Sequence, residues 1–142
     1  MFKRILVPLD IGDEATSERI LSVASDLAKA GEATARLVYV RPFVIDAALA
    51  YLPADFFANE EREAIGRLES LRDKAGFAKD RTSVSSPGGH VRDLLEAEID
   101  TFKPDLIVLG PRRFSAAAAF FIGSTASGIV RTAPCSVLIV RG

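Results

Sequence analysis

The chain has 142 residues, of which 49% are apolar and 26% are charged, and its formal net charge is −1. This length and balance predict one folded domain over residues 1–142 and exclude extended disorder. Because the sequence supplies no basic field for a phosphate backbone, we expect no nucleic-acid partner.

The cysteine count and the opening residues indicate a compartment. Cys135 is the single cysteine, so an internal disulfide cannot form and a reducing compartment is expected. The apolar stretch in residues 1–8 is too short for a signal sequence. No apolar run approaches the roughly 18 residues of a membrane span. We therefore expect a cytoplasmic protein without membrane contact.

The first part of the chain predicts two buried strands with a helix between them. The continuous apolar runs at residues 5–9 and 35–40 are typical of strands that helices cover on both faces. Between them, apolar residues recur every three or four positions. Asp13 is a suitable N-cap for this helix, and Gly31 is a suitable stop.

The middle of the chain is less regular. The apolar segment 43–57 has two interpretations, a flap packed on the sheet edge or part of a lid or subunit interface, because such a patch is seldom left bare. Helical periodicity then runs from about Pro53 to Ala75, and Gly76 ends it. Residues 81–86 are more polar, which predicts a strand at an edge of the sheet.

The last part predicts two more helices and two more strands. A helical pattern from residue 91 ends at Lys103, because Pro104 forbids its continuation. Residues 106–109 and 137–140 are continuous apolar runs and predict buried strands. The helix between them should begin near Gly123. The order of elements is therefore β-α-β-α-β-α-β-α-β.

Strands that alternate with helices in this way predict an α/β fold. We expect a single-domain, three-layer α/β/α sandwich around a five-stranded, mainly parallel sheet with right-handed crossovers, a Rossmann-like arrangement. In such sheets ligands bind outside the carboxyl ends of the strands, where the strand order reverses. The loops that follow Pro8, Tyr39 and Leu109 are therefore the candidate site.

The stretch after Leu109 carries the clearest chemical signal. Gly110 follows a buried strand, and a twelve-residue loop leads to Gly123, Ser124 and Thr125 at the start of a helix. A helix N-terminus offers unpaired N–H groups and a partial positive charge, and glycine lets a phosphate approach the backbone. The two hydroxyl groups add possible donors.

Arginines on the same loop extend this interpretation. Arg112 and Arg113 could pair with phosphate oxygens through charge-assisted hydrogen bonds. The alternative is purely structural: Ser124 caps the helix, the glycine serves the turn, and both arginines are solvated. Short glycine-serine patterns match often by chance, so both interpretations stay open at this point.

Few other residues suggest chemistry. Asp10, at the end of the first strand, could contact a ligand, cap the following helix, or do both. His90 is the only histidine, so a zinc site is not expected, and its position before a helix suggests a solvated cap rather than a catalyst. Motifs of nucleophilic catalysis, the Walker A loop and the dinucleotide fingerprint are missing from the sequence.

Several segments resemble the universal stress protein family. Residues 5–10 are similar to its opening strand, and Gly123-Ser124 with residues 130–140 are similar to its closing helix and strand. Gly89 fits the family glycine before the third helix, and residues 104–110 fit the fourth strand. The resemblance covers the whole chain.

The resemblance implies an adenine nucleotide alpha hydrolase-like fold that binds ATP or AMP, with Mg²⁺ as an accompanying ion. Asp10 would hold the ribose or the adenine edge, and Tyr39 would lend backbone groups to adenine. The loops that begin at Pro8 and Leu109 would frame the ligand. The residues that would surround the phosphates are Gly110, Gly123, Ser124 and Thr125.

The sequence departs from the family pattern at one position. The nucleotide-binding branch has a glycine three residues after Gly110, where this chain has Arg113, and arginine disfavours the positive φ that glycine supplies. Residues 10–11, 51–53 and 133–135 resemble F/G-type members, which also lack this glycine and are associated with adenine nucleotides.

These features predict a dimeric, adenine-nucleotide-binding sensor or regulator of a stress response. One alternative is a nucleotide-free dimeric interaction protein in which Arg113 has replaced the phosphate loop. A weaker alternative is a slow ATPase or self-phosphorylating protein with Ser124 or Thr125 as acceptor, although no obvious base or Mg²⁺ ligand is present.

The homodimer prediction depends on the last strand. Residues 137–140 are apolar, and no later element can cover their outer edge. An exposed apolar edge invites pairing with a second copy. The resemblance implies the same arrangement, with two final strands pairing antiparallel across a two-fold axis.

Overall fold

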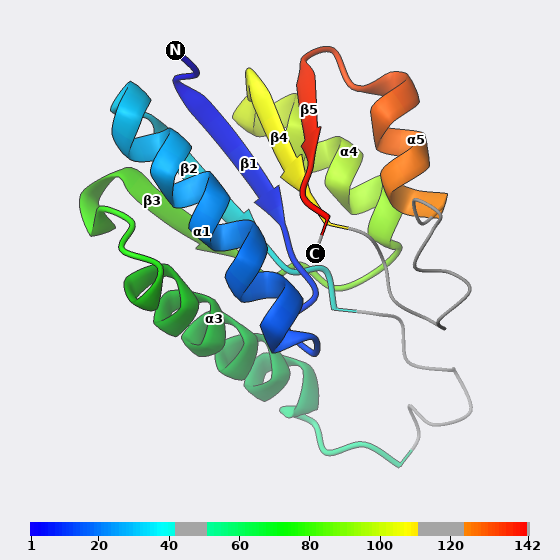
Figure 1. The fold of residues 1–142 in the computed structure, drawn as a ribbon. Helices are drawn as coiled ribbons and strands as arrows, with labels where there is room; N and C mark the ends of the chain where they lie inside the picture. The colour runs from blue at the N-terminus through cyan, green and yellow to red at the C-terminus, as the bar shows by residue number, and fades with distance from the viewer. Residues whose placement is uncertain (42–50, 111–123, 142) are drawn as a thin grey trace.

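The structure is a computed structural model that describes residues 1–41, 51–110 and 124–141. Five strands form one parallel sheet in the order β3-β2-β1-β4-β5, as Figure 1 shows. The strands are β1 (Arg4–Pro8), β2 (Thr34–Val38), β3 (Thr82–Ser85), β4 (Leu106–Leu109) and β5 (Ser136–Ile139). The helices are α1 (Glu14–Gly31), α3 (Phe56–Lys74), α4 (Val91–Phe102) and α5 (Ser124–Thr132), with a short 3₁₀ turn at Lys79–Arg81.

The α/β fold and all five strands are confirmed, and every adjacent strand pair is parallel. Three observed strands begin and end one or two residues before the predicted runs. The reason is that the predicted runs follow burial, which continues past the strand ends, since Leu9 and Val40 are buried. Hydrogen bonds between neighbouring strands also continue there, because Leu9 N–H donates to Val38 O at 2.8 Å and Val140 N–H donates to Leu109 O at 2.7 Å.

The helix ends follow the expected capping chemistry with one difference. Asp13 caps α1, since its Oδ1 accepts from Thr16 N–H at 3.2 Å. α1 ends at Gly31 as predicted, but Glu32 takes the left-handed conformation with φ of 51°. Gly31 is needed for another reason, because a Cβ there would overlap with the carbonyl oxygen of Phe2. α3 begins at Phe56, slightly later than predicted.

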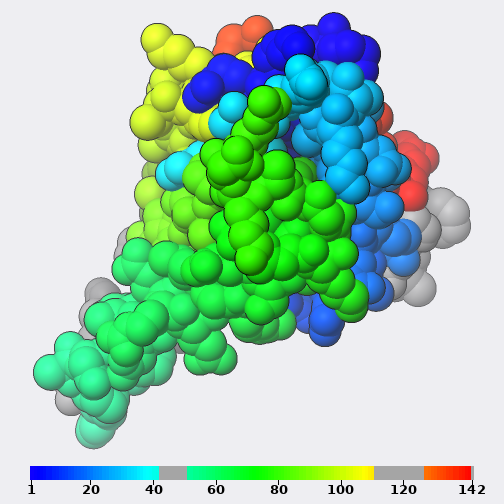
Figure 2. Space-filling view, turned by 90° about the vertical axis from the view of Figure 1, so that its left-hand side faces the viewer, coloured from blue at the N-terminus to red at the C-terminus, as the bar shows by residue number. Residues whose placement is uncertain are grey.

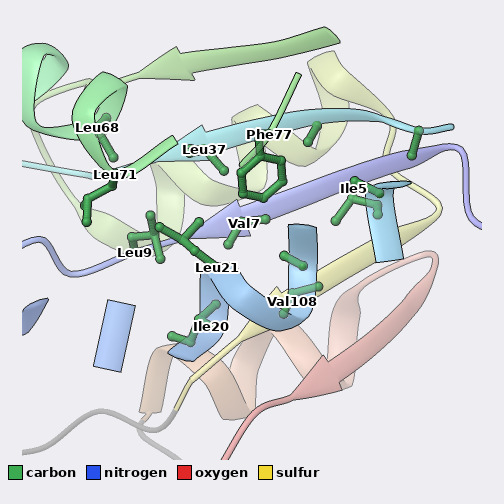
Figure 3. Close-up of a cluster of buried hydrophobic side chains, with 14 of the residues drawn as sticks. Ile5, Val7, Leu9, Ile20, Leu21, Leu37, Leu68, Leu71, Phe77 and Val108 are labelled. Carbon is green, nitrogen blue, oxygen red and sulfur yellow. The ribbon is translucent and has the colours of Figure 1, made fainter. Parts of the chain in front are cut away.

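Two hydrophobic clusters lie on opposite faces of the sheet. One joins α1 and α3 to the sheet, and Figure 3 shows Leu21, Leu68, Val7 and Leu37 among its side chains. The other joins α4 and α5 to the sheet through residues such as Leu95 and Ile129. The alternation along each central strand explains both clusters: in β1, Val7 faces the first cluster and Leu6 the second.

The apolar segment 43–57 is described only from residue 51 onwards. There it projects from the body of the molecule with the start of α3 (Figure 2). Tyr51 is 87% exposed and Phe57 is 47% exposed. These two side chains are therefore not packed on the sheet, which favours the lid or interface interpretation for them.

Within the described ranges, no helix combines the length and the apolar character that a membrane crossing requires.

Candidate functional site

The strand order reverses between β1 and β4. The chain passes from β1 to β2 on one side, while β4 lies on the other side of β1 with Ile5 beside Leu106 and Leu6 beside Ile107. The carboxyl ends of these two strands, at Pro8 and Leu109, meet at one edge of the sheet. In open parallel sheets this is where ligands bind. The edge is the candidate site.

Asp10 shapes the loop that leaves β1. Its Oδ1 accepts from Gly12 N–H at 2.9 Å, and its backbone oxygen accepts from Ser17 Oγ at 2.8 Å. The helix cap is Asp13, so Asp10 closes the turn before α1 rather than capping the helix. The side chain is exposed, which keeps it available at the mouth of the site.

Tyr39 follows β2 at the same edge, but its backbone amide is already used. Its N–H donates to Ser85 O at 3.0 Å, which continues the β2–β3 ladder. Burial, followed by the nearby carboxylates of Asp10 and Glu60, raises the pKa of its phenol above the ordinary value of 10.0. Tyr39 therefore presents a neutral hydroxyl group close to Asp10 at neutral pH. The phenol was not part of the sequence prediction, which considered only backbone groups.

Two arginines that the sequence analysis did not single out support this edge. Arg67 of α3 donates from Nη2 to Ile11 O at 2.6 Å. Arg41 is only 8% exposed and donates from Nε to Ser86 O at 2.9 Å. Its Nη2 also lies 3.7 Å from Glu61 Oε2 in α3. A charged residue directly after the apolar run 35–40 was the signal that could have identified Arg41.

Gly110 has a clear packing role. A Cβ at this position would overlap with Cδ1 of Ile20 and would lie 3.0 Å from its Cγ1. The end of β4 therefore packs directly against α1, and a larger residue at position 110 would have to displace the side chain of Ile20. The carbonyl oxygen of Leu109 accepts from Val140 N–H at 2.7 Å, so β5 satisfies it.

α5 begins at Ser124 on the same edge, close to the predicted start. The first-turn N–H groups of a helix lack acceptors and carry partial positive charge. The first turn of α5 holds no acidic residue, whereas Glu14 and Asp93 lie in the first turns of α1 and α4. The first turn of α3 also lacks an acidic residue, so the N-termini of α3 and α5 suit an anion better than those of α1 and α4.

Some predicted site residues cannot be placed. Arg112, Arg113 and Gly123 lie outside the described residues, and of Ser124 and Thr125 only the backbone is described. The structure therefore brings Pro8, Asp10, Tyr39, Leu109 and Gly110 to one edge together with the start of α5.

A cavity of about 340 Å³ lies beside this edge, between α1 and α3. Figure 2 views this face, where the two helices lie side by side. Its walls include Ile11, Glu14, Gly66 and Arg67. It adjoins the loop after β1 rather than the β1–β4 reversal, so we do not assign the nucleotide to it.

In the described part of the chain, no group of three or more histidine, cysteine, aspartate or glutamate side chains is arranged to hold a metal ion. His90 occupies the N-cap position of α4.

Comparisons with known proteins agree with these features. A universal stress protein of Thermus aquaticus is 34% identical over 99% of this chain and 100% of its own length. Universal stress protein G of Salmonella typhimurium is 29% identical, with the same coverage of both chains, 99% and 100%. This second relative agrees with the resemblance to F/G-type members.

Solved structures show the same fold. A universal stress protein in complex with cAMP is 25% identical, with a TM-score of 0.66 over 98% of this chain and 96% of that one. The UspA protein of Lactobacillus plantarum is 24% identical, with a TM-score of 0.76 over 98% and 97% of the two chains. The profile of the universal stress protein family matches residues 1–141, and the chain belongs to this family.

Proposed function

We propose that this chain binds an adenine nucleotide, ATP or AMP, and serves as a sensor or regulator in a stress response. The observation that carries the proposal is the start of α5 at Ser124, beside the reversal of strand order between β1 and β4. Helix N-termini bind anions, and the strand ends at the switch point of an open parallel sheet are where nucleotides bind.

In this proposal the nucleoside lies against the loops after β1 and β2. The exposed carboxylate of Asp10 accepts from the ribose or the adenine edge, and the neutral phenol of Tyr39 adds a donor nearby. Pro8 and Leu109 frame the crevice from the two strand ends. The complex of a family member with cAMP supports an adenine nucleotide as the ligand class.

The phosphates occupy the N-terminus of α5, with Gly123, Ser124 and Thr125 around them. Arg112 and Arg113 supply positive charge from the preceding loop. Mg²⁺ accompanies the nucleotide through its phosphate oxygens, as is usual for this ion. We also propose a cytoplasmic location, which the single, partly buried Cys135 supports.

Mass spectrometry of the denatured, purified protein tests the proposal directly. We expect ATP, ADP or AMP to be released from it. Calorimetry should then give a dissociation constant in the micromolar range, on the order of −7 to −8 kcal/mol. No released nucleotide, no heat and no thermal shift at millimolar nucleotide would together overturn the proposal.

We further propose that the chain forms a homodimer through β5. In the described sheet β5 pairs with β4 alone and is an edge strand. Its apolar side chains Val137, Leu138 and Ile139 are all partly exposed. This edge is also the observation that favours the second candidate function, a dimeric interaction protein without nucleotide.

A further inference from the structure

The first two turns of α3 extend beyond the body of the molecule. Figure 2 shows the start of this helix projecting together with the residues before it. The buried side chains of α3 begin only at Ala64 and continue with Leu68 and Leu71. None of the side chains of residues 56–63, the overhang, is fully buried. Packing therefore holds the overhang less firmly than the rest of the helix.

The overhang also starts without a side-chain cap. Asp55 occupies the N-cap position but makes no capping hydrogen bond, and the first turn contains no acidic residue. The carboxylate of Asp55 instead accepts from Asn59 Nδ2 at 3.0 Å. Because the first N–H groups of a helix have no partners within it, an uncapped start frays readily. The overhang thus depends on contacts from other elements to stay in place.

Arg41 supplies such contacts from the end of β2. Its Nη1 donates to Phe57 O at 3.4 Å, and its Nη2 lies 3.7 Å from Glu61 Oε2. Phe57 and Glu61 are four residues apart, so they lie on the same side of the helix in successive turns. One guanidinium group therefore holds both turns of the overhang.

The same side chain is anchored more firmly to the strand ends. Arg41 is only 8% exposed, and its Nε donates to Ser86 O at 2.9 Å. Its backbone N–H donates to Pro87 O at 2.8 Å, and its backbone oxygen accepts from Gly89 N–H at 3.0 Å. An added Cβ at Gly88 would lie 3.3 Å from Nη2, so the guanidinium lies against this glycine. Since these bonds are shorter than those to α3, Arg41 stays with the strands when the overhang moves.

The charges favour attachment of the overhang. A buried guanidinium is costly unless it is paired. Glu61 pairs with Arg41, and its own side chain is 51% exposed. Detachment of the overhang would remove this carboxylate from Arg41, whereas Glu61 would lose little solvation.

We propose that Arg41 is a clasp that fastens the overhang to the carboxyl ends of β2 and β3, and that the overhang opens and closes as a unit while the rest of α3 stays folded. The moving unit ends before Ala64, where burial begins. Glu60 belongs to the overhang and acts electrostatically on the phenol of Tyr39. Opening of the clasp therefore changes the surroundings of a residue at the candidate site.

Amide hydrogen exchange of the whole chain, followed residue by residue by NMR, tests this proposal. In Glu61→Gln we expect the amides of residues 60–64 to exchange about two- to fivefold faster than in wild type, because one ion pair is lost. In Arg41→Gln we expect an increase of at least about tenfold, because both contacts to α3 are lost. The amides of residues 70–74, farther along α3, should keep their rates in both variants.

Glu63→Gln is the matched control. It removes the same charge from an exposed position of the overhang that lines the cavity between α1 and α3. Equal acceleration by Glu63→Gln and Glu61→Gln, or unchanged rates in Glu61→Gln, would overturn the clasp. The same holds if Arg41→Gln accelerates residues 60–64 and 70–74 alike, since Arg41 would then support the whole helix. The test uses no nucleotide, so its outcome is independent of the proposed function.

Discussion

Arg67 of α3 donates a hydrogen bond of 2.6 Å to the carbonyl oxygen of Ile11, 56 residues earlier in the chain. The bond ties α3 to the loop that leaves β1. Asp10 lies in this loop, and the charge of Arg67 also acts on the phenol of Tyr39. Arg67 thus links a helix on one face of the sheet to the edge where the nucleotide is proposed to bind.

We predict that Arg67→Ala lowers the free energy of unfolding by about 0.5–1.5 kcal/mol. A hydrogen bond from a charged donor contributes more than this when it is buried, and the exposed position of Arg67 reduces its contribution. Urea titration measures this change. Arg62→Ala, which removes an exposed arginine from the same helix, is the control and should change stability by less than about 0.5 kcal/mol. Equal losses in the two variants would contradict a specific role for the bond.

Gly110 and Ile20 should be energetically coupled. Gly110→Ala is expected to destabilise the chain by about 1–3 kcal/mol, because its Cβ overlaps with Cδ1 of Ile20. Ile20→Val removes this carbon atom at a cost of about 0.5–1.5 kcal/mol by itself. In the double variant the loss should be smaller than the sum of the two single losses. Simple additivity would show that the β4–α1 contact does not limit the size of residue 110.

The pKa of Tyr39 predicts a loss of stability in alkali. Burial and the nearby carboxylates raise the pKa of the folded state above 10.0, so the unfolded state loses this proton first. The contribution is complete below pH 10 and is lost as the pH rises through the folded pKa. Unfolding titrations from pH 8 to 11 should show a steeper fall for wild type than for Tyr39→Phe. Parallel curves for the two proteins would contradict this prediction.

Gly123→Val should abolish nucleotide binding, because its side chain occupies the path by which a phosphate approaches the helix N-terminus. Calorimetry with ATP measures the loss, and a thermal melt checks that the fold is kept. Gly66→Val is the matched control, because Gly66 occupies an exposed position of α3 where an added Cβ meets nothing within 4 Å. An unchanged affinity of Gly123→Val would remove the predicted phosphate site.

The sequence predicts the strands well because parallel strands covered on both faces must be continuously apolar, as in residues 106–109. It predicts their ends to within one or two residues, and at Leu9 and Val140 the hydrogen bonds between neighbouring strands continue one residue past the observed ends of β1 and β5. The sequence did not predict the arginines that hold the loops of the candidate site, because their contacts join distant segments. Arg67 reaches Ile11 from another element, and no local pattern signals such a contact.

The last prediction concerns the open edge of β5. Val140 N–H points towards β4, where it donates to Leu109 O. Successive N–H groups of a strand point to opposite sides, so the N–H of Ile139 points away from β4 to the open edge of the sheet. Ile139→Pro therefore removes an outward donor and leaves the β4–β5 ladder intact, and Leu138 before it is already extended as proline requires. Light scattering should give about twice the 15.3 kDa of one chain for wild type and a value near 15.3 kDa for Ile139→Pro. Val140→Pro is the control, because it breaks the inner ladder and should lower stability rather than act on assembly alone. A wild-type mass near that of one chain would show that β5 does not pair with a second copy.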